Sequence, residues 1–327
     1  MVPSRNLIDD EEPRRSWVWI VVSRSPIASL WNFQGVPIRE VATRAWKAIL
    51  EDRLFGRAAE LAFYFLFALF PTLFSASSVL GLAAKSADKF YDQILQYLQL
   101  VVPTAALGTI LTTFNETTAA ATSGKLTFGL IAAIWSASVG VSAIQDSLNA
   151  VYKLKESRSY LIARAYAIAL TILLAGVFTL ILSAMLGGDL IAAIAHNRIH
   201  SQLLAFTVGA VARFVAWLAA TALLALVFAM VYYWAPDLEK HRWRWFTPGG
   251  AIGIFGWLIA SLGLRIYLNY FNTYSVTYGS LGAVIILLTW FYISGLMLLT
   301  GAEINSEIEA AAIQIQLSNN CANPQSS

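Results

Sequence analysis

Carboxylate and amide side chains at the ends of long apolar runs are the residues of this chain best placed to do chemistry. Asp146 and Asn149 close one such run, and Glu303 and Asn305 follow another. Charged groups at membrane depth are costly and often mark substrate or ion pathways. These four residues therefore form our candidate functional cluster.

Trp135 shares a helical face with Asp146 and Asn149, so the sequence predicts a vestibule on the cytoplasmic side lined by this face. The alternative is a hydrogen-bond network at the helix end with Lys153 or an arginine. The end position favours this alternative, because charge costs least there.

Pro71 lies inside another apolar run, where it removes one backbone hydrogen bond and predicts a bend. A bend can act as a gate or only shape the helix, and we include Pro71 and Trp135 in the candidate cluster.

Small residues at helical steps of three and four predict two helix faces that approach a neighbour closely. The first face has Gly129, Ala133, Ser136, Gly140 and Ala143, and the second has Gly249, Gly253, Gly256, Ala260 and Gly263.

The sequence has no set of residues that would form a metal, cofactor or catalytic site. His196 and His200 are four residues apart, but a metal would need a third ligand and only Asp189 is near in the sequence. Paired catalytic carboxylates, a nucleophile elbow and a phosphate-binding glycine loop are missing from the sequence. We therefore predict no enzyme, no metal and no cofactor.

The elements that position the candidate cluster are membrane helices. The 327 residues are 58% hydrophobic and 13% charged, which leaves more apolar surface than a water-soluble core of this size can bury. Runs of about 20 apolar residues span a bilayer core. They predict an all-α bundle of six transmembrane helices at 61–84, 126–144, 165–186, 214–234, 246–264 and 281–302.

The basic residues set the orientation. Of the 22 Lys and Arg, sixteen precede the first predicted span or lie in the second-to-third and fourth-to-fifth connections. The positive-inside rule puts these segments in the cytoplasm, together with both termini. With 22 basic against 19 acidic residues we expect no nucleic acid partner, but membrane lipids and, at the basic cytoplasmic face, anionic lipid headgroups.

Residues 36–309 make up the membrane domain, between a disordered cytoplasmic tail at 1–35 and a polar cytoplasmic tail at 310–327. Residues 36–53 have helical apolar spacing between charges, which predicts an amphipathic helix that lies in the membrane interface. Residues 88–117 predict a second amphipathic segment outside the membrane, which we interpret as a connector rather than a hairpin over the bundle. The sequence carries no signal of oligomeric state.

Several motifs resemble the YihY/virulence factor BrkB family, which has also been labelled ribonuclease BN-like. The resemblance covers about 36–309 and depends on short motifs in the family's order. These are LAFYFLFALFP from Leu61 to Pro71, Trp135, DSLN at 146–149, Tyr152, Tyr233 with Pro236, Arg244 with Pro248 and Gly249, YGSLG at 278–282, Trp290, Tyr292 and GAEIN at 301–305. Ala68 and Gly250 replace the serine and alanine that many members carry.

This resemblance implies a bacterial inner-membrane protein with six spans. The virulence-factor name suggests a role in the cell envelope, and we interpret it as transport or handling of lipid or envelope precursors. The alternative is a scaffold that does not transport. The ribonuclease label comes last, because RNA cleavage would need acid-base or metal groups on a basic soluble surface.

Overall fold

A computed structural model describes residues 31, 37–82, 123–198, 201–239, 243–270 and 280–322. Within these ranges every regular element is a helix, and there is no strand. The helices are α2 (Ile38–Glu51), α3 (Leu54–Leu82), α6 (Ser123–Val151), α7 (Tyr160–Arg198), α8 (Gln202–Trp234), α9 (Pro248–Tyr270) and α11 (Ser280–Ala322). The predicted all-α class is confirmed, while the outer amphipathic segment at 88–117 lies outside the described residues.

Five of these helices are long and apolar enough to cross a membrane: Phe128–Val151, Tyr160–Arg198, Gln202–Trp234, Pro248–Tyr270 and Leu281–Ile315. They coincide with the second to sixth predicted spans. The first predicted span falls on α3, which is helical for 29 residues but whose side chains are described only in part. The count of six spans therefore stays a prediction.

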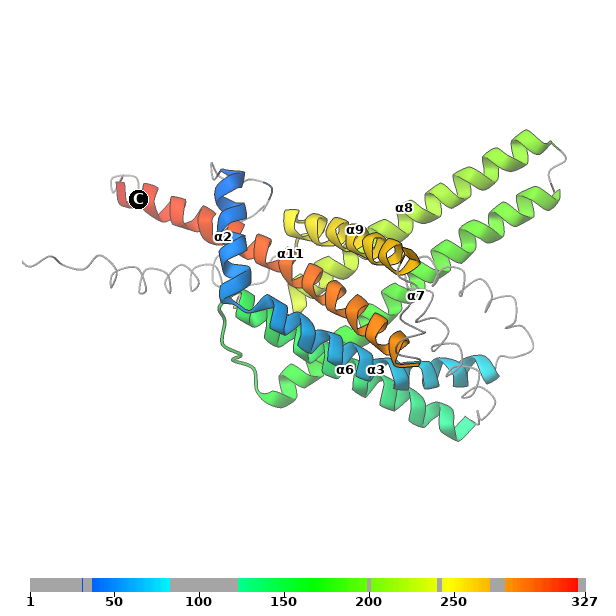
Figure 1. The fold of residues 1–327 in the computed structure, drawn as a ribbon, viewed down its shortest axis with the longest axis horizontal. Coiled ribbons are helices and arrows are strands. Elements are labelled where there is room, and N and C mark those ends of the chain that lie inside the picture. The colour runs from blue at the N-terminus through cyan, green and yellow to red at the C-terminus, as the bar shows by residue number, and fades with distance from the viewer. Residues whose placement is uncertain are drawn as a thin grey trace, which may run out of the picture.

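The bundle is built around α11, which contacts α9, α3, α2 and α6. Figure 1 shows α3, α6 and α11 running across the view, with α9 beside α11. The hairpin of α7 and α8 projects past the bundle at the upper right. At 1.5 Å per residue, the 39 residues of α7 extend about 58 Å, nearly twice the ~30 Å bilayer core.

In Figure 1, helix α2 passes across the C-terminal part of α11, and its lower end meets the start of α3. Its buried residues Val41, Ala45, Ala48 and Ile49 recur at steps of four, three and one, and the helix packs on α11 and α3. The apolar face seen in the sequence thus meets protein, because α11 continues beside it. Ile38, at the start of this face, remains 72% exposed, and Trp46, beside the packed face, remains 60% exposed. Its placement in the membrane interface stays a prediction.

Helix α11 extends to Ala322, beyond residue 309 where the sequence analysis ended the membrane domain. The residues after 309 begin with Ala310, Ala311, Ala312 and Ile313, which are at most 3% exposed. Because these side chains join the core at the end of the bundle that α2 crosses, the helix has a packed face well past the apolar run.

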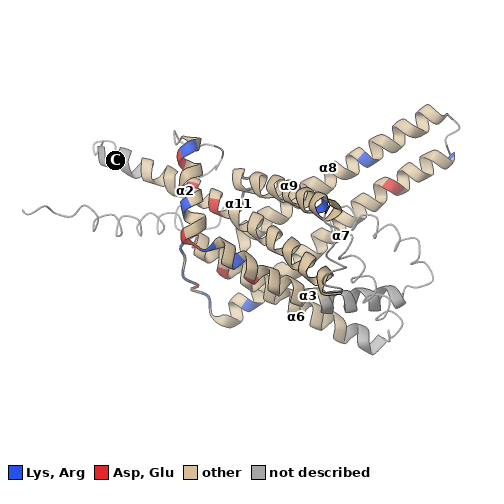
Figure 2. Cartoon of the chain, viewed as in Figure 1, with Lys and Arg blue, Asp and Glu red and all other residues tan. Residues whose placement is uncertain are grey.

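Charges gather at this same end of the molecule. In Figure 2, most of the backbone coloured for charged residues lies on α2, the start of α3, the connection after α6 and the adjoining part of α11. Isolated charges on α7 and α8 include the pair Arg213 and Asp189, whose side chains are 3.0 Å apart. The cytoplasmic orientation of the charged end remains a prediction from the positive-inside rule.

Candidate functional site

Helices α3 and α6 meet where Pro71 interrupts the hydrogen bonding of α3. Proline has no N–H, so the carbonyl of Phe67 four residues earlier loses its helical donor. The hydroxyl of Ser136 in α6 donates a long hydrogen bond of 3.4 Å to this carbonyl. One helical turn further along α6, a Cβ on Gly140 would lie 3.3 Å from the ring of Phe65. Pro71 and the small-residue face of α6 thus belong to one packed seam, and α3 stays helical through Pro71.

Helix α9 begins on α11 with almost no space between the backbones. A Cβ on Gly249 would lie 1.9 Å from the carbonyl oxygen of Gly301, and one on Gly256 would lie 2.8 Å from Met297 Sδ. Pro248 occupies the first helical position, where no backbone donor is needed.

The buried side chain of Asn305 helps to hold the start of α9. Its amide oxygen accepts from the Gly249 N–H at 2.9 Å, and its amide nitrogen donates to Thr247 Oγ1 at 2.9 Å. Thr247 Oγ1 in turn accepts from the Gly250 N–H at 3.0 Å. Two of the unpaired N–H groups at the helix start are therefore satisfied by side chains, one of them from a neighbouring helix. In this arrangement Asn305 positions α9 and has no free polar atom for a cargo.

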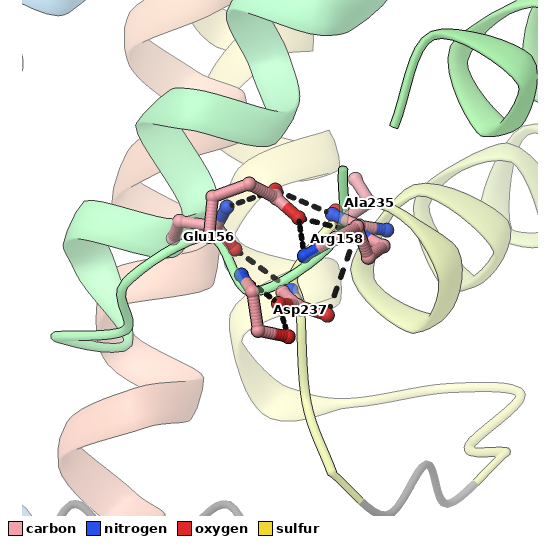
Figure 3. Close-up of polar contacts among 6 residues, drawn as sticks. Glu156, Arg158, Ala235 and Asp237 are labelled. Atoms are coloured by element: carbon pink, nitrogen blue, oxygen red, sulfur yellow. Dashed lines mark hydrogen bonds and ion pairs between the residues drawn. The ribbon is translucent and has the colours of Figure 1, made fainter. Parts of the chain in front are cut away.

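The connection after α6 is tied to the end of α8 by a polar network (Figure 3). Asn149 Nδ2 donates to Glu156 at 2.8 Å, and Asn149 Oδ1 accepts from the Asp237 N–H at 2.7 Å. Arg158 Nε lies 2.6 Å from Glu156 and 3.4 Å from Asp237. The hydrogen bond from Arg158 and the one from Asn149 lower the pKa of Glu156, although burial opposes the shift. Asn149 is thus part of a structural lock between two connections.

Asp146 is exposed and makes no hydrogen bond or ion pair with any described residue. Its nearest charges are Glu156, Glu60, Arg57 and Arg158, so acids and bases surround it in equal number. Of the candidate cluster, Asp146 alone is a polar group open to solvent or headgroups.

Glu303 is fully buried on α11. Both of its carboxylate oxygens lack a hydrogen-bond partner within the described residues. Its electrostatic neighbours are Asp52, between α2 and α3, and Lys153, just after α6. Residues two apart on a helix point to different sides, so Glu303 faces these elements while Asn305 faces α9. The predicted cluster is therefore divided among separate environments on different sides of the helices.

An arginine outside the predicted cluster lies beside the apolar span of α6. Arg164 in α7 stacks on the ring of Trp135 at 4.4 Å, and its guanidinium donates to the Trp135 carbonyl at 3.1 Å and to Ser142 Oγ at 3.2 Å. Trp135 and Ser142 are 7 and 14 residues into the span that starts at Phe128, or about 11 and 21 Å along it. No carboxylate in the described part of the chain pairs with Arg164, and its Nε has no partner.

Sequence reasoning missed Arg164 because it placed this residue in the cytoplasmic connection, one position before the span at 165–186. The signal was nevertheless present, since Tyr160, Leu161, Ile162 and Ala163 extend the apolar run in front of it. Helix α7 begins at Tyr160, and so Arg164 lies inside the helix. Trp135, which is 57% exposed, supplies the ring beneath the cation.

Comparison with known proteins gives one family and a set of bacterial relatives. The family described as Virulence factor BrkB matches residues 45–323. A putative ribonuclease-like protein YfkH of Bacillus subtilis (strain 168) is 36% identical over 253 residues, which cover 77% of this chain and 88% of that protein. A UPF0761 membrane protein of Xanthomonas oryzae pv. oryzae (strain PXO99A) is 26% identical over 270 residues, which cover 82% of this chain but 60% of that protein. No solved structure matches the chain.

Proposed function

The chain belongs to the virulence factor BrkB family of bacterial membrane proteins, and from that premise we propose that it moves or handles phosphate-bearing lipids or envelope precursors at the membrane. The observation that supports this most strongly is Arg164. A cation that stacks on Trp135 beside the apolar span of α6, with no carboxylate partner in the described residues, suits an anionic group that arrives from the lipid phase.

The surface around Arg164 fits both the phosphate headgroup and the acyl chains of such a lipid. Arginine binds phosphate through paired N–H donors, and two of its nitrogens are already oriented by Ser142 and Trp135. Around the cation the helices expose apolar side chains to the acyl region, among them Leu161 and Phe128. Asp146, closer to the charged end, would meet the amine or hydroxyl part of a headgroup as it enters. Pro71 and the packed seam of α3 and α6 would define the flank along which the lipid moves.

A proteoliposome assay tests this function directly. Purified protein is reconstituted with a trace of fluorescent phosphatidylglycerol, and an impermeant reductant then measures how fast labelled lipid changes leaflets. We expect movement above that of empty liposomes. Arg164→Gln should slow it at least several-fold, because the phosphate loses its cation, and Arg164→Lys should retain part of the rate.

Matched controls separate this site from a general effect of charge. Arg213→Gln removes an arginine that is 62% exposed and paired with Asp189 on the α7–α8 hairpin, and should leave the rate unchanged. Asp146→Asn tests the predicted entrance. Absence of lipid movement by folded wild-type protein would rule out leaflet exchange, and equal rates in Arg164→Gln and wild type would remove Arg164 from the pathway.

A scaffold is the second candidate, and helix α2 is the observation in its favour. Trp46 and Leu50 are 60% and 53% exposed on α2, away from the face that packs on the bundle, and Ile38 is 72% exposed at the start of the helix. Such a surface suits headgroups or a partner protein. A scaffold would lose function in cells when Trp46 and Leu50 are changed to serine, with lipid movement intact.

A further inference from the structure

The most unusual group in the described core is the carboxyl of Glu303. Its exposed fraction is 0%, and neither oxygen has a hydrogen-bond donor among the described residues. The nearby hydroxyl of Ser306 donates to the backbone carbonyl of Glu303 at 3.0 Å. A buried ionised carboxylate without a donor is far more costly than the neutral acid. The site therefore favours a carboxyl that carries a proton.

The charged groups that face Glu303 come from each element packed around it. Asp52 comes from the connection between α2 and α3, Lys153 and the phenol of Tyr152 from the turn just after α6, and Glu307 from the next turn of α11. The ammonium of Lys153 binds Asp52 Oδ1, and Asp52 Oδ2 is buried without a partner in the described residues. Asp52 and Glu303 thus share one ammonium, which is engaged by Asp52. Among the described residues no second cation pairs with either carboxylate, because the guanidinium of Arg57 donates to the backbone carbonyl of Asp52 instead.

The route to water runs through the same pair. The side chains of Lys153 and Asp52 are 27% and 12% exposed to solvent, whereas Glu303 is fully buried. A proton that leaves Glu303 can reach water along these two side chains. The Lys153 ammonium would then be attracted to the new carboxylate, because both acids lie within its field.

We propose that Glu303 is a proton-binding site, occupied in the resting protein, and that release of its proton draws Lys153 from Asp52 toward Glu303. The carboxyl O–H bond breaks, the proton passes to water, and the ammonium keeps its three protons while it changes carboxylate. No co-reactant is needed. The proposal stands on Glu303 and its neighbours alone and does not depend on the cargo proposed above.

A change of partner by Lys153 would alter the joint between α2 and α3. Asp52 follows the last residue of α2, and the next residue, Arg53, has a left-handed φ of 54°. Lys153 also has a left-handed φ of 55°, a conformation that is uncommon for residues other than glycine. The ion pair thus joins two turns that each contain a residue with a left-handed backbone conformation. Loss of the pair would loosen the joint between α2 and α3, which offers a way for proton binding to control the charged end of the bundle.

Infrared spectroscopy of the full-length protein in lipid bilayers tests the proposal without any transport assay. A protonated carboxyl has a C=O stretching band that a carboxylate lacks. We expect wild type to show this band at neutral pH and to lose it as the pH is raised. Glu303→Gln should lack it, and Glu40→Gln, which changes an exposed glutamate paired with Arg44 on α2, should retain it.

Two neighbouring variants should move the midpoint of this titration in opposite directions. Asp52→Asn removes a nearby negative charge and frees Lys153 for Glu303, so the band should disappear at lower pH than in wild type. Lys153→Met removes the ammonium that faces both acids, and the band should persist to higher pH. Glu303→Gln imitates the protonated acid, so its melting temperature at neutral pH should not fall.

Three results of these experiments would overturn the proposal for Glu303. A wild-type spectrum without the band at neutral pH would show an ionised Glu303 and overturn the proposal. If the folded protein were in addition stabilised by sodium and not by choline, a cation would occupy the place that we assign to the proton. A band that survives in Glu303→Gln would belong to another acid and would also overturn it.

Discussion

At the scale of single residues, the connection after α6 gives a clear pH dependence. The hydrogen bond from Arg158 lowers the pKa of Glu156, so this group stabilises the fold above the ordinary carboxyl range and loses that contribution as the pH falls through its folded pKa. Because Glu156 is partly solvated, we expect about 0.2–1 kcal/mol from the network. Glu156→Gln should lower the melting temperature at neutral pH and flatten its decline as the pH falls below the ordinary carboxyl range.

Thermal unfolding of the purified protein across this pH range measures the effect. Glu40→Gln serves as the control, since it removes a glutamate from an exposed pair one turn apart with Arg44. Its decline in acid should match that of wild type. If Glu156→Gln has the same acid limb as wild type, the Glu156–Arg158 pair does not contribute to stability in solution.

Residue types and spacing located several functional candidates but not their partners. The sequence pointed to Glu303 and Asn305 together, yet one faces Asp52 and Lys153 while the other holds the start of α9. The helical period separates residues two apart, so this division followed from geometry once α11 was known to continue as a helix. Arg164 was harder, because counting charges per connection gives no information about how far a long side chain reaches.

At the scale of helices, the hairpin of α7 and α8 offers a test in which one glycine controls for its neighbour. A Cβ on Gly188 would lie 2.5 Å from Ala216 Cβ in α8, while nothing lies within 4 Å of a Cβ on Gly187. Both substitutions to alanine gain similar helix propensity, worth about 1 kcal/mol. Gly188→Ala must also push the helices apart, which costs about 1–3 kcal/mol.

We therefore expect Gly187→Ala to melt at or above the wild-type temperature and Gly188→Ala to melt below it. Differential scanning fluorimetry in detergent compares the two proteins under one condition. Equal melting temperatures would mean that α7 and α8 do not pack at Gly188 in solution.

The helix cores were predictable from sequence and the helix ends were not. Each predicted span from 126 onward falls on an observed helix, because about 20 apolar residues in a row have no other stable structure in a bilayer. The ends extend further, as in α7 to Arg198 and α11 to Ala322. These extensions are stabilised by contacts with α8 and α2, which a search for apolar runs cannot detect.

At the scale of the whole molecule, the number of helices that cross the membrane can be tested by finding on which side of the membrane α2 and the end of α11 lie. Five crossings would place α2 and the end of α11 on opposite sides, whereas a sixth crossing by α3 would return them to the same side. The chain has a single cysteine, Cys321, so its labelling by an impermeant maleimide reports the C-terminal side directly. In a Cys321→Ser background, Ala42→Cys reports the exposed surface of α2, and Ser201→Cys reports the connection between α7 and α8.

We expect Cys321 and Ala42→Cys to react in inverted vesicles and Ser201→Cys to react in intact cells, because the excess of Lys and Arg holds the first two sites in the cytoplasm. Detergent-opened membranes, in which all three sites should react, control for buried thiols. Opposite sides for Cys321 and Ala42→Cys would leave α3 outside the set of spans. That result would contradict the packing of α2 on α11, and because α3 could not form a transmembrane seam with α6, the lipid route along Pro71 would have to be abandoned.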